Sequence, residues 1–287
     1  MEHLFLLFYF IFGTIIGSFL NVVILRHNTG RSISGRSACA HCQARLGWFE
    51  LVPIFSWVWH RGRCRYCGSA ISVQYPLVEI LTGVLFSLGA FIDLNVIPLF
   101  IYFCIVSVLI SITVYDIKHT IIPDGWVYLF SILALLFVVS TGQVTTFSDF
   151  LLRVGSGLSL SAPFAFLWFI SKGRWMGLGD AKLIIGIGVL LGLSQGFFSV
   201  MISFVVGALV GVLLLFLSSE RLKTFVRNFT PTLASKRLME GFTMKSEIPF
   251  GPFLIGVSFV VWTLNLKGIN IHLDMINVAL VSLSSWL

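Results

Sequence analysis

The chain has 287 residues, of which 57% are hydrophobic and only 11% are charged, and its mean hydropathy is +0.98. This composition excludes a soluble globular domain, because apolar stretches of about 17–25 residues recur and each can span a bilayer as a helix. The roughly ten-residue alternation of a membrane β-barrel does not occur, so we expect a helical bundle. The net charge of +7 comes from basic residues that flank apolar stretches, which indicates an orientation signal and not nucleic-acid binding.

The first apolar stretch, residues 4–25, is expected to be a retained membrane span. It lacks a basic segment ahead of it and a small-residue cleavage site before Arg26, so it does not resemble a signal peptide. Gly13, Gly17 and Asn21 follow one another at roughly helical spacing. Small residues on one face let a second helix approach, and an asparagine can hydrogen-bond across the contact, so this face predicts helix packing in preference to catalysis.

Residues 26–74 form a basic segment, with seven arginines against the single acid Glu50. The positive-inside rule places such a segment in the cytosol and the N-terminus outside. Within it, residues 51–59 are apolar but too short to span a bilayer, so we expect an interfacial or re-entrant piece with aromatic side chains at the headgroup level.

The same segment contains two C-x-x-C pairs about twenty residues apart, formed by Cys39, Cys42, Cys64 and Cys67. This spacing predicts tetrahedral thiolate coordination of a structural zinc ion, with His41 or His60 as alternative ligands. Two disulfides are the other interpretation, which a reducing cytosol disfavours. The fifth cysteine, Cys104, lies in an apolar stretch and is expected to be a small buried residue.

Two acidic residues stand near the cytosolic ends of the next two spans. Residues 75–91 form the second span, with Glu79 about one turn from its start; such a carboxylate forms an ion pair or has a function, and the loop arginines are its expected partners. Residues 96–115 return the chain to the cytosol, and Asp116 follows directly. The polar bend after it ends at Pro123, which suits a helix start.

A third carboxylate, Asp180, opens a later span. Residues 125–140 lead out of the cytosol and residues 150–170 lead back. Gly177 and Gly179, which lack a Cβ, let the backbone turn sharply before Asp180 and the long apolar run behind it. Span parity and charge therefore place Asp116 and Asp180 at the same cytosolic boundary, on different helices.

Two carboxyl groups at one membrane face can hydrolyse a peptide. One activates water while the other donates a proton, and two nearby shielded carboxyls cannot both ionise cheaply, so the pair shares a proton. Lys118 and Lys182 are placed to offset that effect, or to bind substrate or lipid phosphates. For each aspartate alone a helix N-cap or an ion pair is the simpler interpretation, and Asp180 in particular stands just before a helix.

The remaining chain is expected to add a short, tilted span at residues 183–194 and full spans at residues 197–217 and 248–266. A basic cytosolic loop, residues 220–247, separates the last two. The tail, residues 269–287, is left open between a last span and an interfacial helix.

The predicted fold class is therefore all-α: a polytopic transmembrane bundle of about eight spans with a cytosolic zinc-binding loop. We divide it into a first span (1–25), the four-cysteine loop (26–74) and a protease bundle (75–287).

These motifs together resemble the prepilin peptidases, membrane aspartic proteases of the GxGD group. The resemblance is carried by the C-x-x-C pairs and by residues 17–23 (GSFLNVV), 74–79 (QYPLVE), 116–124, 177–182 (GLGDAK) and 248–252 (IPFGP). It implies that Asp116 and Asp180 are the catalytic pair, at the cytosolic face of a bacterial inner membrane. By the same resemblance the supporting residues are Gly177, Gly179, Asp124, Lys182 and Glu79.

The implied reaction is cleavage, after a glycine, of the basic leader of type IV prepilin or pseudopilin precursors. The resemblance also implies N-methylation of the new N-terminus with S-adenosylmethionine, for which no glycine-rich binding fingerprint is present. Prepilin-like precursors and membrane lipids are thus the expected partners. A proton-coupled transporter and a non-catalytic zinc-bearing scaffold are the alternatives. A transporter predicts acids at the bilayer midplane, and a scaffold leaves both aspartates unexplained.

Overall fold

The computed structural model describes residues 2–30, 32, 34–217 and 249–269. Over these residues the fold is all-helical apart from two isolated β-bridges, Ala38 with Arg45 and Arg63 with Ala70, which confirms the predicted fold class. The elements are α1 (Glu2–Arg26), a 3-10 helix η1 (Trp48–Leu51), α2 (Phe55–Trp59), α3 (Gln74–Ala90), α4 (Val96–His119), α5 (Asp124–Ser140), α6 (Phe147–Ser171), α7 (Leu178–Leu191), α8 (Leu193–Leu217) and α11 (Gly251–Leu266).

Four of the described helices, α1, α4, α6 and α8, are long and apolar enough to cross a membrane. Three apolar helices of 10–17 residues, α3, α5 and α11, accompany them, so the total of about eight spans stays a prediction. The predicted basic segment 220–247 and, apart from Ile269, the tail lie outside the described residues.

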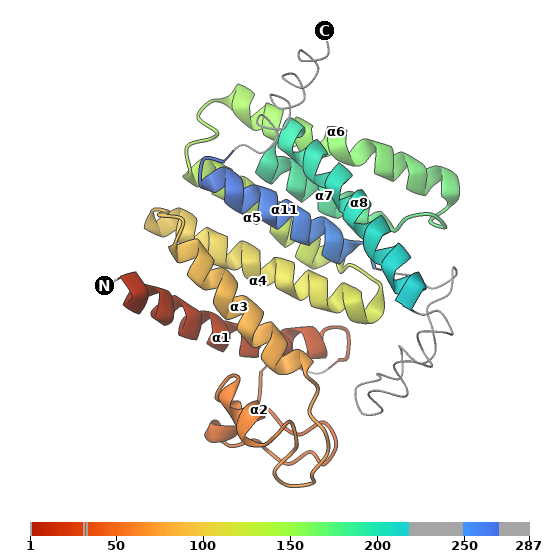
Figure 1. Ribbon diagram of the computed structural model, residues 1–287. Helices are drawn as coiled ribbons and strands as arrows, with labels where there is room; N and C mark the ends of the chain where they lie inside the picture. The colour runs from red at the N-terminus through yellow and green to blue at the C-terminus, as the bar shows by residue number, and fades with distance from the viewer. Residues whose placement is uncertain (1, 31, 33, 218–248, 270–287) are drawn as a thin grey trace.

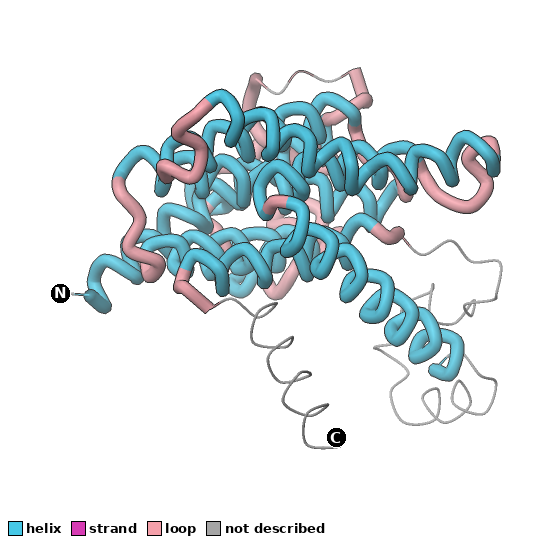
Figure 2. The backbone as a smooth tube through the Cα atoms, turned by 90° about the horizontal axis from the view of Figure 1, so that it is seen from above, coloured by secondary structure: helices cyan, strands magenta, loops and turns pink. Residues whose placement is uncertain are grey.

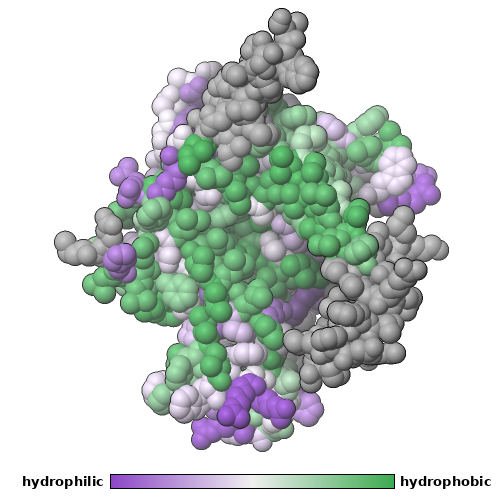
Figure 3. All heavy atoms as spheres, viewed as in Figure 1, coloured by the Kyte–Doolittle hydropathy of each residue, from purple (hydrophilic) through white to green (hydrophobic). Residues whose placement is uncertain are grey.

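The helices pack side by side, with α1, α3 and α4 in contact with one another, and with α7 among α5, α6 and α8 (Figures 1 and 2). Leu183, Ile184 and Ile187 of α7 are almost completely buried, which makes α7 the central helix of its half. The surface over the helices is largely apolar, while hydrophilic side chains gather on the loop between α1 and α3 (Figure 3). Such a contiguous apolar surface fits a lipid environment.

Helix α1 contacts α3 through the face that the small residues predict. A Cβ at position 13 would lie 2.7 Å from the carbonyl oxygen of Thr82, and one at position 17 would lie 2.8 Å from Cα of Glu79. Asn21 is buried, and its Nδ2 donates to the carbonyl oxygens of Gly17 and Tyr75, each at 3.2 Å. The predicted packing role of these residues is confirmed.

The boundaries of α7 differ from the predicted ones. The helix begins at Leu178, so Asp180 lies inside its first turn and not ahead of it. It ends at Leu191, and α8 begins at Leu193 after the single residue Gly192, whose φ of 78° is a conformation that glycine adopts without a Cβ penalty. The predicted break between the two helices near residue 195 is therefore a tight corner at Gly192, three residues earlier. Helix α7 has 14 residues and is about 21 Å long.

Candidate active site

Asp116 lies in the last complete turn of α4, with its side chain pointing into the protein. Only 4% of the residue is exposed, and its Oδ2 has no hydrogen-bond partner among the described residues. The helix ends three residues later, where Thr120 adopts a left-handed conformation and its N–H donates to the carbonyl oxygen of Asp116 at 2.7 Å. The backbone of Asp116 thus closes the helix while its carboxylate is left for other chemistry.

Asp180 lies in the first turn of α7 and is half-buried. The residue before the helix is Gly177, which is the N-cap, so the interpretation of Asp180 as an N-cap is wrong. Its Oδ2 reaches back toward this residue, because a Cβ on Gly177 would lie 3.3 Å from it. A carboxylate in the first turn is favoured by the helix dipole, which helps to hold this charge at the edge of the bundle.

The ends of three helices bring the two aspartates together. A Cβ on Gly251, the first residue of α11, would lie 2.6 Å from Oδ2 of Asp116 and 3.2 Å from Cδ1 of Ile122. A Cβ on Gly179 would lie 2.9 Å from Cβ of the same Ile122. Ile122 therefore separates Gly251 from Gly179, and the two carboxyl groups are close enough for the charge of Asp116 to act directly on Asp180.

The supporting pair Asp124 and Lys182 joins the starts of α5 and α7. Nζ of Lys182 lies 2.8 Å from Oδ2 of Asp124 and 5.6 Å from the ring centroid of Tyr128. The contact between Lys182 and Asp124 is the one ion pair among the described residues, so neither Asp116 nor Asp180 forms an ion pair there. This contact ties α7 to α5, and the hypothesis that Lys182 offsets the charge of the two aspartates stays a prediction.

Glu79 is buried, and the structure gives it a partner other than an arginine. Its Oε2 accepts a hydrogen bond of 2.7 Å from the backbone N–H of Ile54, in the cysteine-containing loop. No ion pair to Glu79 occurs within the described ranges. The expected pairing with loop arginines is thus corrected, because a backbone donor at the start of α2 satisfies the carboxylate instead.

The four cysteines of the two C-x-x-C pairs converge, and their Sγ atoms all lie within 4.8 Å of one another. None of them forms a disulfide, and Sγ of Cys39 lies 3.9 Å from Sγ of Cys67. Four sulfurs around a zinc ion at about 2.3 Å stand roughly 3.8 Å apart, so the cluster fits that metal without His41 or His60.

Each C-x-x-C pair sits in a small turn of the same design. The residue after the second cysteine, Gln43 or Gly68, has a positive φ and donates its N–H to the carbonyl oxygen of the first cysteine. In the first turn, the backbone N–H groups of Cys42 and His41 lower the pKa of the Cys39 thiol to about 6. Because thiolates are the metal-binding form, this backbone arrangement favours metal binding.

Two family models match the chain. Residues 11–92 match the Bacterial Peptidase A24 N-terminal domain, and residues 103–212 match the Type IV leader peptidase family. The first match contains all four clustered cysteines and Glu79, and the second contains Asp116 and Asp180.

Curated relatives carry the name prepilin leader peptidase/N-methyltransferase. One from Myxococcus xanthus is 34% identical over 217 residues, which is 74% of this chain and 64% of the relative. One from Pectobacterium carotovorum is 33% identical over 63% of this chain and 73% of the relative, and one from Bacillus subtilis is 30% identical over 80% and 91%. The chain belongs to the type IV leader peptidase family. No solved structure matches it.

Two features of this site could not be predicted from the sequence. The IPFGP motif was seen, but only the fold shows that its Gly251 presses against Asp116. Beside Asp116, the rings of His27, Tyr115 and Trp126 cluster, with His27 5.2 Å from Tyr115 and 4.5 Å from Trp126. This cluster joins the end of α1 to α4 and α5, and no sequence motif marks it.

We expect Gly251→Ala to lower leader cleavage by about ten- to hundredfold, because the added methyl group displaces the Asp116 carboxylate without removing it. The measurement is the initial rate of cleavage of a precursor in detergent. Gly256→Ala on the same helix is the matched control, since a Cβ there meets no atom within 4 Å. Equal rates for the two variants would show that the close approach of α11 does not position Asp116.

We expect the purified protein to contain about one zinc ion per chain, bound by the four clustered thiolates. Elemental analysis together with thiol titration checks this, and Cys64→Ser should lower the metal content while Cys104→Ser, outside the cluster, leaves it unchanged. Metal-free protein with all four clustered thiols reactive would contradict the prediction.

Proposed function

We propose that this chain is a membrane aspartic endopeptidase that removes the leader peptide from type IV prepilin or pseudopilin precursors, with Asp116 and Asp180 as its catalytic residues. The observation that carries the proposal is the convergence of these two carboxyl groups, from different helices, within direct electrostatic reach at one end of the bundle. The names of the curated relatives supply the substrate class.

Hydrolysis by such a pair needs no covalent intermediate. The ionised carboxylate takes a proton from water as the water oxygen bonds to the scissile carbonyl carbon, and the protonated carboxyl donates its proton to the carbonyl oxygen. The tetrahedral intermediate then collapses and the C–N bond breaks. The nitrogen accepts the proton that the first carboxylate took from water and leaves as the free amine, while the hydroxyl formed on the carbonyl oxygen returns its proton to the second carboxylate. The unpartnered Oδ2 of Asp116 is the natural position for the water or the substrate carbonyl, because a buried carboxylate oxygen gains from a donor.

The position of the pair supports cleavage at a membrane boundary. Asp116 lies in the last turn of α4 and Asp180 in the first turn of α7, so both stand at helix ends and away from the bilayer midplane. With residues 26–74 cytosolic by the positive-inside rule, that boundary is the cytosolic one. Cleavage after a glycine follows from the resemblance to the GxGD group. The same placement speaks against a proton-coupled transporter, which needs acids near the midplane.

We further propose that the zinc-bearing loop belongs to a second activity, N-methylation of the new N-terminus with S-adenosylmethionine. The support is the double name of the relatives and the match of residues 11–92 to a separate N-terminal domain. Zinc would order a loop that has little apolar core of its own. The division into residues 1–25, 26–74 and 75–287 belongs to this proposal.

Replacing either aspartate should stop cleavage while leaving the fold intact. We expect Asp116→Asn and Asp180→Asn each to lower the cleavage rate by about 10²–10⁴-fold or more, because an amide neither takes nor gives the proton. The rate is measured on a precursor in detergent, with zinc content as the test of folding. Asp93→Asn is the control: this exposed residue precedes α4 at the opposite end, and its left-handed backbone suits asparagine.

If the Asp116→Asn variant cleaves the precursor as fast as the Asp93→Asn control, Asp116 is not a catalytic residue and the proposed pair is wrong.

The two activities should be separable. We expect Cys64→Ser to reduce methylation of the product more than cleavage. The substitution removes a buried thiolate of the proposed zinc site in the loop and changes neither carboxylate. Mass spectrometry of the processed precursor distinguishes cleaved and methylated chains from cleaved and unmethylated ones. The control is Cys104→Ser in α4. Loss of cleavage as complete as in Asp180→Asn would show that the loop is part of the peptidase.

A further inference from the structure

The loop between α1 and α3 exposes an apolar surface that neither the zinc site nor the proposed peptidase uses. We call it the aromatic face; it consists of Trp48, Phe49, Leu51, Phe55, Val58 and Trp59. Trp48 and Trp59 are each 72% exposed, and Trp48 stacks on Phe49 with ring centroids 3.7 Å apart, as Phe55 stacks on Trp59 at 5.6 Å. Large aromatic side chains exposed in adjacent stacks are costly in water, so this face needs a partner.

Contacts within the loop hold the side chains of the aromatic face in their exposed positions. Trp57 points to the opposite side of α2, where its indole N–H donates to the carbonyl oxygen of Ile71 at 3.2 Å and its ring packs against Gly62. In η1, the Glu50 carboxylate accepts the backbone N–H of Gly47 at 2.7 Å and fixes the start of that turn. The loop therefore has a fixed inner side, and the aromatic face is its fixed outer side.

The depth of this face follows from Glu79. This residue is the sixth of α3, about 7.5 Å along an apolar helix from its cytosolic end, and it holds the N–H of Ile54 directly before α2. Around it, α3 exposes Leu77, Ile80 and Leu81, which in a membrane helix face lipid. Figure 1 shows the loop next to α1 and the start of α3, on the side away from the other helices. The start of α2 thus lies beside the second turn of a membrane helix, at the boundary between headgroups and acyl chains.

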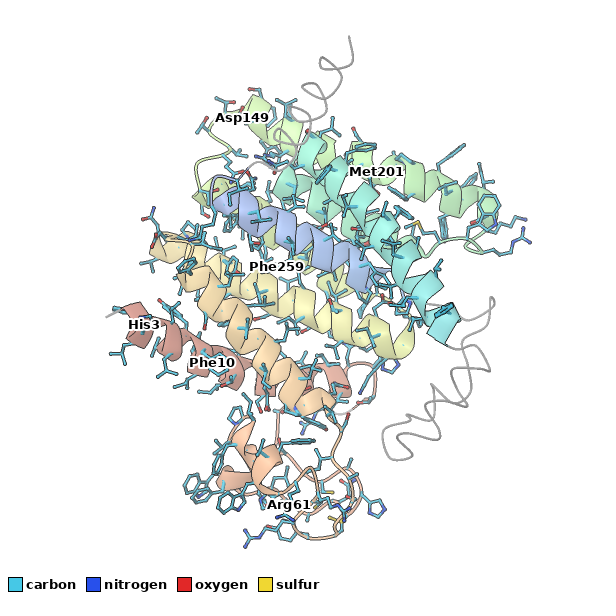
Figure 4. The ribbon with its side chains drawn as sticks, in the orientation of Figure 1. His3, Phe10, Arg61, Asp149, Met201 and Phe259 are labelled. Carbon is cyan, nitrogen blue, oxygen red and sulfur yellow. The ribbon has the colours of Figure 1, made fainter. Side chains whose placement is uncertain are left out.

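The charge of the loop indicates which lipids this boundary suits. Exposed arginines without an ion pair among the described residues surround the zinc cluster in sequence: Arg36, Arg45, Arg61, Arg63 and Arg65. Arg61 lies at the side of the loop away from the helices (Figure 4). Tryptophan at the headgroup level combined with exposed arginine is the chemistry that binds an anionic bilayer surface.

We propose that the aromatic face inserts into the headgroup region of an anionic bilayer and so holds the zinc-bearing loop against the membrane. The loop is then a second membrane contact of the chain, separate from its spanning helices. This inference does not rest on the proposed peptidase, and its test does not use cleavage.

The test places an environment-sensitive fluorescent amino acid at position 58 of the full chain, or at position 40 as the matched control, because Ala40 is exposed in the same loop but belongs neither to the aromatic face nor to the arginines. Each protein is placed singly in nanodiscs of equimolar phosphatidylglycerol and phosphatidylcholine that carry spin-labelled lipids. We expect lipids labelled near the acyl carbonyl to quench roughly half of the fluorescence at position 58, those labelled at the chain end to quench it less, and neither to affect position 40. Nanodiscs of phosphatidylcholine alone should give weaker quenching at position 58.

A second variant guards against misfolding. Trp48→Ser combined with Trp59→Ser should lose the quenching at position 58 while retaining its zinc, which shows that the face and not the whole loop binds lipid. Equal quenching at positions 58 and 40, or none at either, overturns the proposal. If added precursor abolishes the quenching at position 58, the aromatic face is a protein-binding surface and the proposal is overturned. If the fluorescence changes only with two copies per nanodisc, the aromatic face is a dimer contact and the proposal is also overturned.

Discussion

The proximity of the Asp116 and Asp180 carboxyl groups is the constraint around which the half of the molecule that contains them is arranged. Two like charges in a poorly solvated site repel each other, so the surrounding packing must hold them together. That packing consists of helix ends: the close of α4, the first turn of α7 and the first residue of α11, with Ile122 between them. Asp116, Asp180 and Gly251 sit on helices and not on long loops, which places functional groups more precisely.

Small residues make this arrangement possible. Helix α7 lies so near its neighbours that a Cβ on Gly186 would stand 2.5 Å from the ring of Phe130, and one on Gly188 would stand 2.6 Å from Cα of Gly157. In a membrane, where water does not drive helices together, such close backbone approach supplies the packing energy. The ion pair between Lys182 and Asp124 adds a polar tie at the exposed end of α7, where a salt bridge contributes little to stability but fixes an orientation.

The N-terminal half is held together by polar contacts and is joined to the rest by aromatic ones. Glu79 links α3 to the cysteine-containing loop, and Asn21 links α1 to α3. The rings of His27, Tyr115 and Trp126 link the end of α1 to α4, which bears Asp116, and to α5. A buried carboxylate bonded to a backbone N–H is costly to break, because the freed charge would be left unsolvated. The loop and the aspartates are therefore mechanically connected even though two family models divide the chain between them.

The sequence by itself determined the all-helical class, the packing face of Gly13, Gly17 and Asn21, and the clustering of the four cysteines, because each depends on local periodicity or on spacing within one short segment. It also placed Asp116 and Asp180 at one face by counting spans. Contacts between distant segments were decided only in the tertiary structure. Lys182 took Asp124 as its partner, Glu79 took the N–H of Ile54 in place of an arginine, and Gly251 came to press on Asp116. The physical reason is that a buried polar group bonds whichever donor or acceptor the packing brings within about 3 Å, and residue spacing carries no information about that neighbour.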